Sequence, residues 1–463
     1  MAKSGFKYIS FGGLIATIVL LITATIIEKL EGSHFALNLV YHSPIFIALL
    51  GITAISALLY IIRLRQIRLF LLHAALATIL SGAFISHLTA KHGEIILAKE
   101  AVPASMFIND KEELKKLPFR MMLAETQTLH DNEDNIIDYI AKIEIYDDYS
   151  NVTNSISMNK PIKKEGYTFC IKNHSHDAVS LLVTHDTWGS TVTYCGYTLF
   201  IIIFILTIID RKSLFSSLSH KKESKKQSTT IFETALYIIC TTLFIIIGTV
   251  GIIRWNAIEL FPVTNGYEAM IFISWCGLLI GLITRKHNRL ILPAMFTLAA
   301  TSLLTATIAG NNNDGYVMPI LRTPLLGLHV SCVILSYTLI GFLAINATVA
   351  IFYKNFSKRE YKAVLLADTG RKVLYPTTIL LFTGIFIGAV WAEISWGRYW
   401  GWDPKEVWAL ITLLLCSLPF HTKSMPLLAK PMVFHYFCII LFWVMLFTYL
   451  GVNYFLGGMH AYL

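Results

Sequence analysis

Apolar runs long enough to cross a bilayer recur along the whole chain. A membrane-spanning helix needs roughly 17–25 mostly apolar residues. About eleven runs fit, at 9–27, 43–62, 69–89, 193–210, 231–253, 267–284, 290–309, 325–353, 374–392, 407–420 and 431–456. The run at 407–420 is short, and the run at 325–353 is long enough to tilt. The pattern predicts a polytopic α-helical membrane protein.

Residues 91–190 interrupt this pattern. Polar and apolar residues alternate there, as over 141–146 and 179–184, which predicts strands. We therefore expect a small β-rich domain between the third and fourth helices. The stretch 211–230 is rich in Ser and Lys and is interpreted as a linker between two modules. The predicted organisation is three helices in 1–90, the β-rich domain in 91–190, a fourth helix in 191–210, the linker in 211–230, and seven helices in 231–463.

The composition agrees with the pattern. Of the 463 residues, 55% are hydrophobic and 14% are charged, against about 25% charged in soluble domains. This excludes a soluble globular protein. The formal net charge of +9 divides unevenly, because 91–190 holds 16 acidic and 11 basic residues. Elsewhere the Lys and Arg residues flank the spans, so no nucleic-acid partner is expected, and the lipid bilayer is the environment of the chain.

The basic residues also predict an orientation. If the N-terminus is inside, the inner connections collect 22 Lys and Arg outside the 91–190 segment, and the outer ones collect five. The positive-inside rule then places the N-terminus in the cytoplasm, and the C-terminus and residues 91–190 outside. The first run has no clear cleavage site and is expected to be a retained helix.

The seven cysteines form no C-x-x-C pair. This disfavours a thioredoxin-like motif, a zinc knuckle and a self-attached c-type haem.

Five of the nine tryptophans lie within 391–408, together with Arg398 and Tyr399. The five are Trp391, Trp396, Trp400, Trp402 and Trp408. An aromatic belt at the membrane interface is one explanation, but a belt spreads its rings over many helix ends. Concentrated rings beside an arginine favour a platform for a planar anionic ligand. Asp403, Pro404 and Glu406 form a helix-start signature, so the loop should be anchored.

Four histidines fall into two pairs by predicted membrane depth. His329 and His460 lie at the outer face, as the tryptophan loop does, and two imidazoles with an aromatic platform are the parts of a bis-histidine haem site. His73 and His421 lie near the cytoplasmic side, one in each module, and suggest a second ligand pair. A single histidine at a helix end is more often an ordinary polar group, and His42, His87, His92, His287 and His435 are assigned to that class. His87 is the main alternative to His73.

The segment W-G-R-Y-W-G-W-D-P-K-E-V-W, at 396–408, resembles the tryptophan-rich "WWD" signature of haem-handling proteins of cytochrome c maturation. The segment 319–330 with His329, the helix end at His421 and the G-V-N-x(6)-H terminus are similar to the CcsA (ResC) branch. The first 210 residues are similar to CcsB (ResB), more weakly. Together the chain resembles the CcsBA system II cytochrome c synthetases.

The resemblance implies a multi-pass protein of the bacterial cytoplasmic (inner) membrane that transports haem b and attaches it by thioether bonds to CXXCH motifs of apocytochrome c. It implies axial ligation by His73 and His421 in a transmembrane site, and by His329 and His460 in an outer site. Trp396, Trp400, Trp402 and Asp403 would present the haem, with Trp391, Arg398, Tyr399 and Trp408 beside them. Thiol-reducing extracytoplasmic proteins would be partners. No general acid or base stands out.

Two other functions fit part of the sequence. A b-type electron-transfer subunit also uses bis-histidine haem, but it would not need the aromatic loop. A haem exporter or chaperone without synthetase activity would not need the CcsB-like half.

Overall fold

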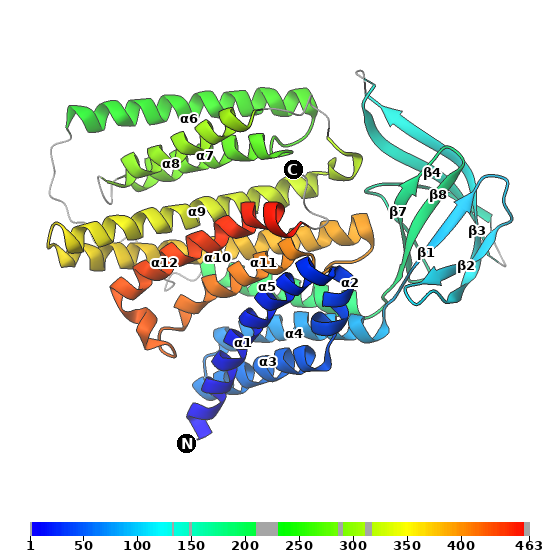
Figure 1. The fold of residues 1–463 in the computed structure, drawn as a ribbon, viewed down its shortest axis with the longest axis horizontal. Helices are drawn as coiled ribbons and strands as arrows, with labels where there is room; N and C mark the ends of the chain where they lie inside the picture. Colours follow the sequence, from blue (N-terminus) through cyan, green and yellow to red (C-terminus); the bar gives the residue numbers. More distant parts are fainter. Residues whose placement is uncertain are drawn as a thin grey trace.

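The fold joins a bundle of long helices to one β-sheet. The structure is a computed structural model and describes residues 2–131, 134–147, 151–209, 230–285, 290–310 and 317–457. The helices run roughly along one direction, and the sheet lies at one end of them (Figure 1). The N-terminus lies at the opposite end of the bundle from the sheet. The two ends of the bundle therefore offer two separate places for a site.

The first half of the chain forms one group of helices around the sheet insertion. These are α1 (Ala2–Glu31), α2 (Ser33–Ala36), η1 (Leu37–Tyr41), α3 (Pro44–Leu64), α4 (Ile67–Thr89) and α5 (Gly189–Ile209). The sheet is inserted between α4 and α5, which pack against each other. The last turn of α4 and the first turn of α5 therefore lie next to the sheet.

The second half forms the larger group. It consists of α6 (Ile231–Ile258), α7 (Gly266–Thr284), α8 (Ile291–Ala309), η3 (Pro319–Leu321), α9 (Pro324–Asn355), α10 (Glu360–Trp396), α11 (Pro404–Ser417), η4 (Leu418–His421), η5 (Pro426–Ala429), α12 (Pro431–Leu446) and η6 (Phe447–Leu456). The long helices α9 and α10 pack along each other. The two halves meet where Val407 and Ile411 of α11 pack among buried side chains of α1.

Each of the predicted spans coincides with a helix. Among the described residues, nine helices are long and apolar enough to cross a membrane, and Gly189–Ile203 is a shorter apolar helix. The predicted span at 407–420 forms α11 and continues into the 3₁₀ turn η4. Exposed apolar side chains form a stripe on α6, at Ile238, Ile245 and Ile252. Their seven-residue spacing puts them on one helix face, as expected for contact with lipid.

Two helices differ from the predicted spans in a physically informative way. The helix α10 begins at Glu360, well before the predicted start at 374, because its polar first turns continue the helix beyond the apolar segment. The predicted last span at 431–456 divides into α12 and the wider π-helical segment η6. Hydropathy shows where an apolar segment lies. It does not show how far the hydrogen-bonded helix continues beyond that segment.

The β-rich domain is one antiparallel sheet. Its strands are β1 (Lys91–Ala98), β2 (Ala104–Asn109), β3 (Leu114–His130), β4 (Ile136–Tyr146), β5 (Asn151–Ser157), β6 (Ile162–Lys164), β7 (Tyr167–His174) and β8 (Ala178–His185). Their order is β5-β4-β3-β2-β1-β8-β7-β6. Alternate residues of β4, Ala141, Ile143 and Ile145, are fully buried, so one sheet face forms the domain core. The strands predicted over 141–146 and 179–184 are confirmed.

The predicted linker at 211–230 lies outside the described residues except for its last residue. Thr230 is the N-cap of α6, and its side chain forms a capping box with Glu233.

Candidate functional site

His73 and His421 bring the two halves of the chain together. We call them the inner pair, and the sheet end of the bundle the outer end, after the orientation predicted from the sequence. His73 lies in the second turn of α4, and His421 is the last residue of η4, directly after α11. Their ring centroids are 6.1 Å apart, and the ring planes are close to perpendicular at 85°. The sequence predicted only that the two residues share a membrane depth, and the structure places their rings next to each other.

Each of these imidazoles is oriented by its own helix. Nδ1 of His73 lies 2.9 Å from the carbonyl oxygen of Leu69, and Nδ1 of His421 lies 3.0 Å from that of Ser417. Because a carbonyl only accepts, each Nδ1 carries the hydrogen and donates it. The other nitrogen, Nε2, then holds the lone pair that a metal requires. Metal-binding histidines commonly use a backbone carbonyl in this way.

The spacing of the two rings suits two ligands on opposite sides of one metal ion. A histidine nitrogen binds a transition metal at about 2 Å, so two axial imidazoles have ring centroids about 6 Å apart. Phe11 packs edge-on against His421 at 5.3 Å. Nearby, Tyr60 of α3 and Ser424 share a hydrogen bond of 3.2 Å between their hydroxyls. The donor set and its surroundings therefore fit the iron of a haem.

At the other end of the bundle, His329 lies in the second turn of α9 and faces α10. Its Nδ1 lies 2.6 Å from the carbonyl oxygen of Gly384. A Cβ atom at Gly388 would lie 2.6 Å from the ring, so the absence of a side chain there makes room for the imidazole. Its predicted partner, His460, lies outside the described residues. The outer pair therefore stays a prediction.

The tryptophan loop is anchored at both ends, and the sequence predicted the anchor at Asp403. The helix α10 ends at Trp396, and Gly397 follows with a φ of +71°. At the far end, Asp403 is the N-cap of α11 and forms a capping box with Glu406. The Glu406 carboxylate also accepts hydrogen bonds from the backbone N–H groups of Gly401 and Asp403. These bonds fix the loop backbone before any ligand binds.

Three loop tryptophans pack against other parts of the protein. Trp402 has a φ of +59° and stacks on Tyr41 of η1, with centroids 4.6 Å apart and planes 14° apart. Trp408 donates a hydrogen bond from Nε1 to Thr25 of α1 at 3.2 Å. Trp391 is buried within α10. Part of the predicted ligand platform thus serves to join the loop to the first half of the chain.

The other aromatic rings of the loop are only partly buried. Trp396 contacts Trp391 edge-on at 4.9 Å, and Trp400 contacts Trp402 edge-on at 5.8 Å. Arg398 is exposed, and its guanidinium lies over Gly401, where a Cβ would be 3.3 Å from Cζ. Trp402 and Trp408 are partly exposed as well, and the role of all these side chains in binding a ligand stays a prediction.

The sheet domain contacts the same loop from the other side. The Cys170 thiol of β7 donates to the carbonyl of Ile394 at 3.5 Å. The Ser395 hydroxyl donates to the side-chain oxygen of Asn159 at 2.9 Å. A Cβ at Gly397 would lie 2.9 Å from the Thr184 hydroxyl of β8. The loop is thus packed directly against the sheet.

Helices α4 and α5 complete the support of the loop. The Tyr399 hydroxyl donates to Ser86 of α4 at 2.9 Å, and Ser86 donates to Asp186 at 2.5 Å. Tyr194 of α5 donates a short hydrogen bond to the carboxylate of Glu393. These contacts join three segments that are at least 100 residues apart in the sequence.

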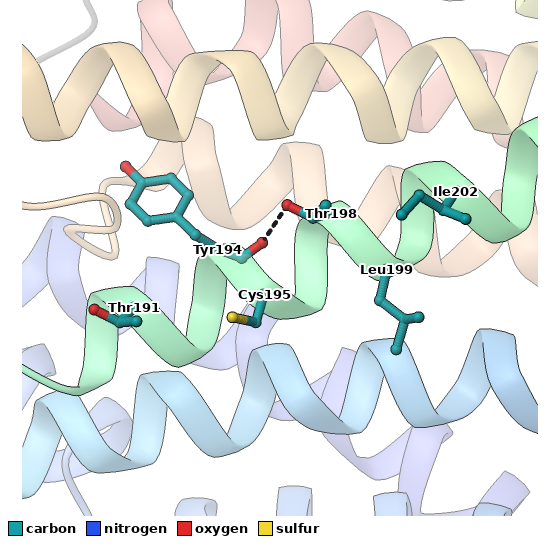
Figure 2. Close-up of a pocket in the computed structure, with 6 residues that line it drawn as sticks. All are labelled: Thr191, Tyr194, Cys195, Thr198, Leu199 and Ile202. Carbon is teal, nitrogen blue, oxygen red and sulfur yellow. Dashed lines mark hydrogen bonds between the residues drawn. The ribbon is translucent and has the colours of Figure 1, made fainter.

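An open groove of about 530 Å³ lies along α5 on this side of the molecule (Figure 2). It is lined by Thr191, Tyr194, Cys195, Thr198, Leu199 and Ile202. The Thr198 hydroxyl is already bonded to the Tyr194 carbonyl at 2.9 Å. The lining offers no imidazole, so the groove does not provide axial ligands for iron.

Comparison with known proteins identifies both halves of the chain. Residues 263–460 match a family model described as cytochrome C assembly protein, and residues 62–199 match the ResB-like family. The chain is 32% identical over 259 residues to the cytochrome c biogenesis protein CcsA of Guillardia theta, covering 48% of this chain and 82% of that protein. The chain belongs to the CcsA family. It combines a ResB-like domain and a CcsA domain in one chain, which makes it a CcsBA-type fused system II protein of cytochrome c biogenesis.

Other relatives agree with this assignment. CcsA of Atropa belladonna is 31% identical over 268 residues, covering 48% of this chain and 83% of that protein. Protein NrfI of Wolinella succinogenes is 34% identical over 211 residues, covering 43% of this chain. That match spans only 23% of NrfI, so this chain corresponds to a small part of that relative's length.

The inner pair therefore takes His73 from the ResB-like domain and His421 from the CcsA domain. At the outer end, His329 and the whole tryptophan loop belong to the CcsA domain, and the first half of the chain, including the ResB-like domain, supplies supports around the loop.

Burial sets the protonation of the groups beside the loop. The pKa of His92 in β1 is lowered by burial, raised by Asp110 and lowered further by Arg398. The pKa of His42, whose side chain is partly exposed, is lowered by its partial burial and by the neighbouring His87 and His92. Burial also raises the pKa of Cys170 to about 12. The imidazoles thus favour their neutral form, and the thiol stays protonated near pH 7.

Several supports of the CcsA loop were missed by sequence reasoning. Tyr41, Ser86, Asn159 and Tyr194 all belong to the first half and contact the loop across long sequence separations. No spacing or motif in one sequence could have indicated these pairings.

Proposed function

We propose that this chain carries haem across the cytoplasmic membrane and joins it covalently to apocytochrome c. The observation that carries the proposal is the inner pair, because each domain contributes one oriented imidazole at a spacing that fits axial ligation. Membership of a cytochrome c biogenesis family supports haem as the molecule that these ligands bind.

The basic residues support a direction of transport. They favour a cytoplasmic N-terminus. His73 lies in the second turn of α4, and the sheet follows the opposite end of this helix. Haem b would then enter near His73 and His421, and it would reach His329 and His460 on the far side of the bacterial inner membrane.

The chemistry at the outer site needs no acid or base from the protein. Each cysteine thiol of a CXXCH motif adds across a haem vinyl group, so that sulfur bonds to one vinyl carbon and the hydrogen is transferred to the other. No oxidant is needed, but the thiols must be reduced, which suits a thiol-reducing extracytoplasmic partner. Haem supplies the reactive vinyl groups.

The loop residues would hold haem in position for this addition. Trp396, Trp400 and Trp402 offer flat apolar surface, and Arg398 offers a positive charge for a propionate. Asp403 acts through the capping box that fixes the loop backbone. The contribution of the protein is orientation of two reactants, which is a large part of many catalysed reactions.

The decisive experiment is expression of this chain with a CXXCH apocytochrome in a host that lacks its own maturation system. We expect covalently bound haem, detected by haem staining after denaturing electrophoresis. A substrate with SXXSH in place of CXXCH is the matched control and should give none. Haem that copurifies with the chain without any covalent product would contradict synthesis and favour the exporter or the electron carrier.

The outer ligands can be tested in the same system. His329→Ala and His460→Ala should each lose outer-site haem and covalent product, and added imidazole should restore part of both. Unchanged haem content and an unchanged spectrum in both variants would exclude these two residues as ligands.

A further inference from the structure

A second pair of facing imidazoles lies at the sheet end of the ResB-like half. His42 directly follows η1, and His87 lies in the last turn of α4. Their ring centroids are 4.9 Å apart, with planes inclined by 46°. Both side chains are exposed. Within the described part of the chain, neither ring forms a hydrogen bond or an ion pair. Sequence reasoning had assigned both residues to ordinary polar positions.

This pair is distinct from the inner pair. His73 and His87 lie on the same helix, 14 residues apart, which corresponds to about 21 Å along an α-helix. No single ion or haem iron can contact both. The two pairs therefore have to be considered as separate sites, each with its own geometry.

The ring separation distinguishes the kind of metal coordination that each pair can form. With a nitrogen–metal bond of about 2 Å, a ring centroid lies about 3 Å from the metal. Ligands on opposite sides of an ion then have centroids about 6 Å apart, and ligands at a tetrahedral angle have them about 5 Å apart. The inner pair, at 6.1 Å, has the spacing expected for ligands on opposite sides of an ion. The pair of His42 and His87, at 4.9 Å, has the spacing expected for ligands at a tetrahedral angle.

The surrounding groups narrow the choice of ion. The nearest further histidine is His92, which influences the pKa of His42, but its Nδ1 lies 3.3 Å from the Thr184 hydroxyl. The described residues contain no group of three or more His, Cys, Asp or Glu arranged to hold a metal. Two imidazoles suit zinc or copper and not calcium or magnesium, which prefer oxygen ligands.

We propose that His42 and His87 together bind one imidazole-preferring divalent ion, Zn²⁺ or Cu²⁺, with water in the remaining coordination positions. The ion would connect the segment before α3 to the end of α4. Tyr41, next to His42, stacks on Trp402, and Ser86, next to His87, is bonded to Tyr399. The ion would therefore join two segments that both support the tryptophan loop.

The test is a metal titration of the purified full-length chain in detergent. Zn²⁺ binding is followed by competition with a chromogenic indicator, and Cu²⁺ binding by electron paramagnetic resonance. The wild type should bind one more equivalent than His42→Ala or His87→Ala, and its Cu²⁺ spectrum should show coupling to two imidazole nitrogens. His34→Ala is the matched control, because His34 is an exposed histidine of the neighbouring helix α2. It should retain the full stoichiometry.

Two results would overturn the proposal. One is an unchanged stoichiometry in the double variant His42→Ala/His87→Ala. The other is loss of haem absorbance together with the metal site in both single variants, which would make the pair a haem ligand set. Because both side chains are exposed, the variants should fold, and an unchanged melting temperature without added metal verifies this. The titration uses no apocytochrome, so its result is independent of whether the chain is a synthetase.

Discussion

The inner histidine pair and the tryptophan loop both join the two domains, but they do so in different ways. At the inner end, one imidazole from each domain faces the other, Phe11 packs edge-on against His421, and Tyr60 shares a hydrogen bond with Ser424. At the outer end, the loop is held by stacked rings, a buried thiol and several side-chain hydrogen bonds.

The difference suggests a division of tasks between the two ends. Two facing rings, one from each domain, can be separated by a small movement of one domain and can then admit and release a large ligand. A densely bonded loop keeps its shape and can hold a ligand in one orientation, as a preorganised site requires. Substitutions at the inner end should therefore affect haem content directly, and substitutions at the outer end should affect stability as well.

The largest effect is expected from either member of the inner pair. His73→Ala and His421→Ala should abolish covalent haem product and remove the bis-histidine spectrum of the inner site, because an iron atom loses one axial ligand. The measurement is haem per protein with the absorption spectrum, and His34→Ala is the control. If only one of the two substitutions changed the spectrum, the 6.1 Å pair would not be a ligand pair.

The next effect concerns the stacked rings that connect the loop to η1. Tyr41→Ala should destabilise the folded chain by about 3 kcal/mol, since it removes a buried aromatic ring and its stack on Trp402. Tyr41→Phe keeps the ring, and the Tyr41 hydroxyl is buried without a partner among the described residues. Phe should therefore be neutral or slightly stabilising. Thermal unfolding in detergent measures both, and equal losses would show that the stack contributes nothing.

A smaller effect is expected at Glu393. Tyr194→Phe removes the hydrogen bond to this mostly buried carboxylate and should cost about 1–3 kcal/mol. Lys163→Ala removes an ion pair of 3.7 Å whose lysine is 63% exposed, and it should cost less than about 1 kcal/mol. The reverse order of these two losses in thermal unfolding would mean that the ion pair from the sheet domain stabilises Glu393 more than the tyrosine bond from α5 does.

The smallest perturbation is chemical labelling of Cys170, which lies at the contact between sheet and loop. With a pKa of about 12, its thiol is ionised at pH 8 to about one part in ten thousand. Alkylation should therefore be slow and should accelerate about tenfold per pH unit up to that pKa. A chain with Cys170→Ser and Ser175→Cys has an exposed thiol in the same domain and should react rapidly. Rapid labelling of Cys170 at pH 8 would show that the loop separates from the sheet.

The sequence was sufficient for the parts of the fold that depend on local pattern. Apolar length located the helices, alternation located β4 and β8, and the Asp403 to Glu406 signature predicted a capping box that the structure contains. The predicted membrane depth was enough to pair His73 with His421, because the basic connections indicate which end of each helix lies on which side of the membrane.

The same reasoning could not find contacts that depend on how helices turn about their axes. Depth does not say which way a ring points, so the pair of His42 and His87 was assigned to ordinary positions although the rings lie 4.9 Å apart. Likewise, five tryptophans in one loop suggested a single ligand surface. In the structure Trp402 and Trp408 contact η1 and α1, because packing between segments distant in sequence decides what each ring meets.

Trp402 has a backbone conformation that is unfavourable for a residue with a side chain. A φ of +59° belongs to the left-handed region, where a residue other than glycine is strained by about 1–3 kcal/mol. Glycine would relieve that strain but would leave Tyr41 without its ring partner. The stack of Trp402 on Tyr41 is therefore kept although the backbone of Trp402 adopts an unfavourable conformation. The contact with Tyr41 therefore offsets a conformational strain that the loop backbone keeps in the folded protein.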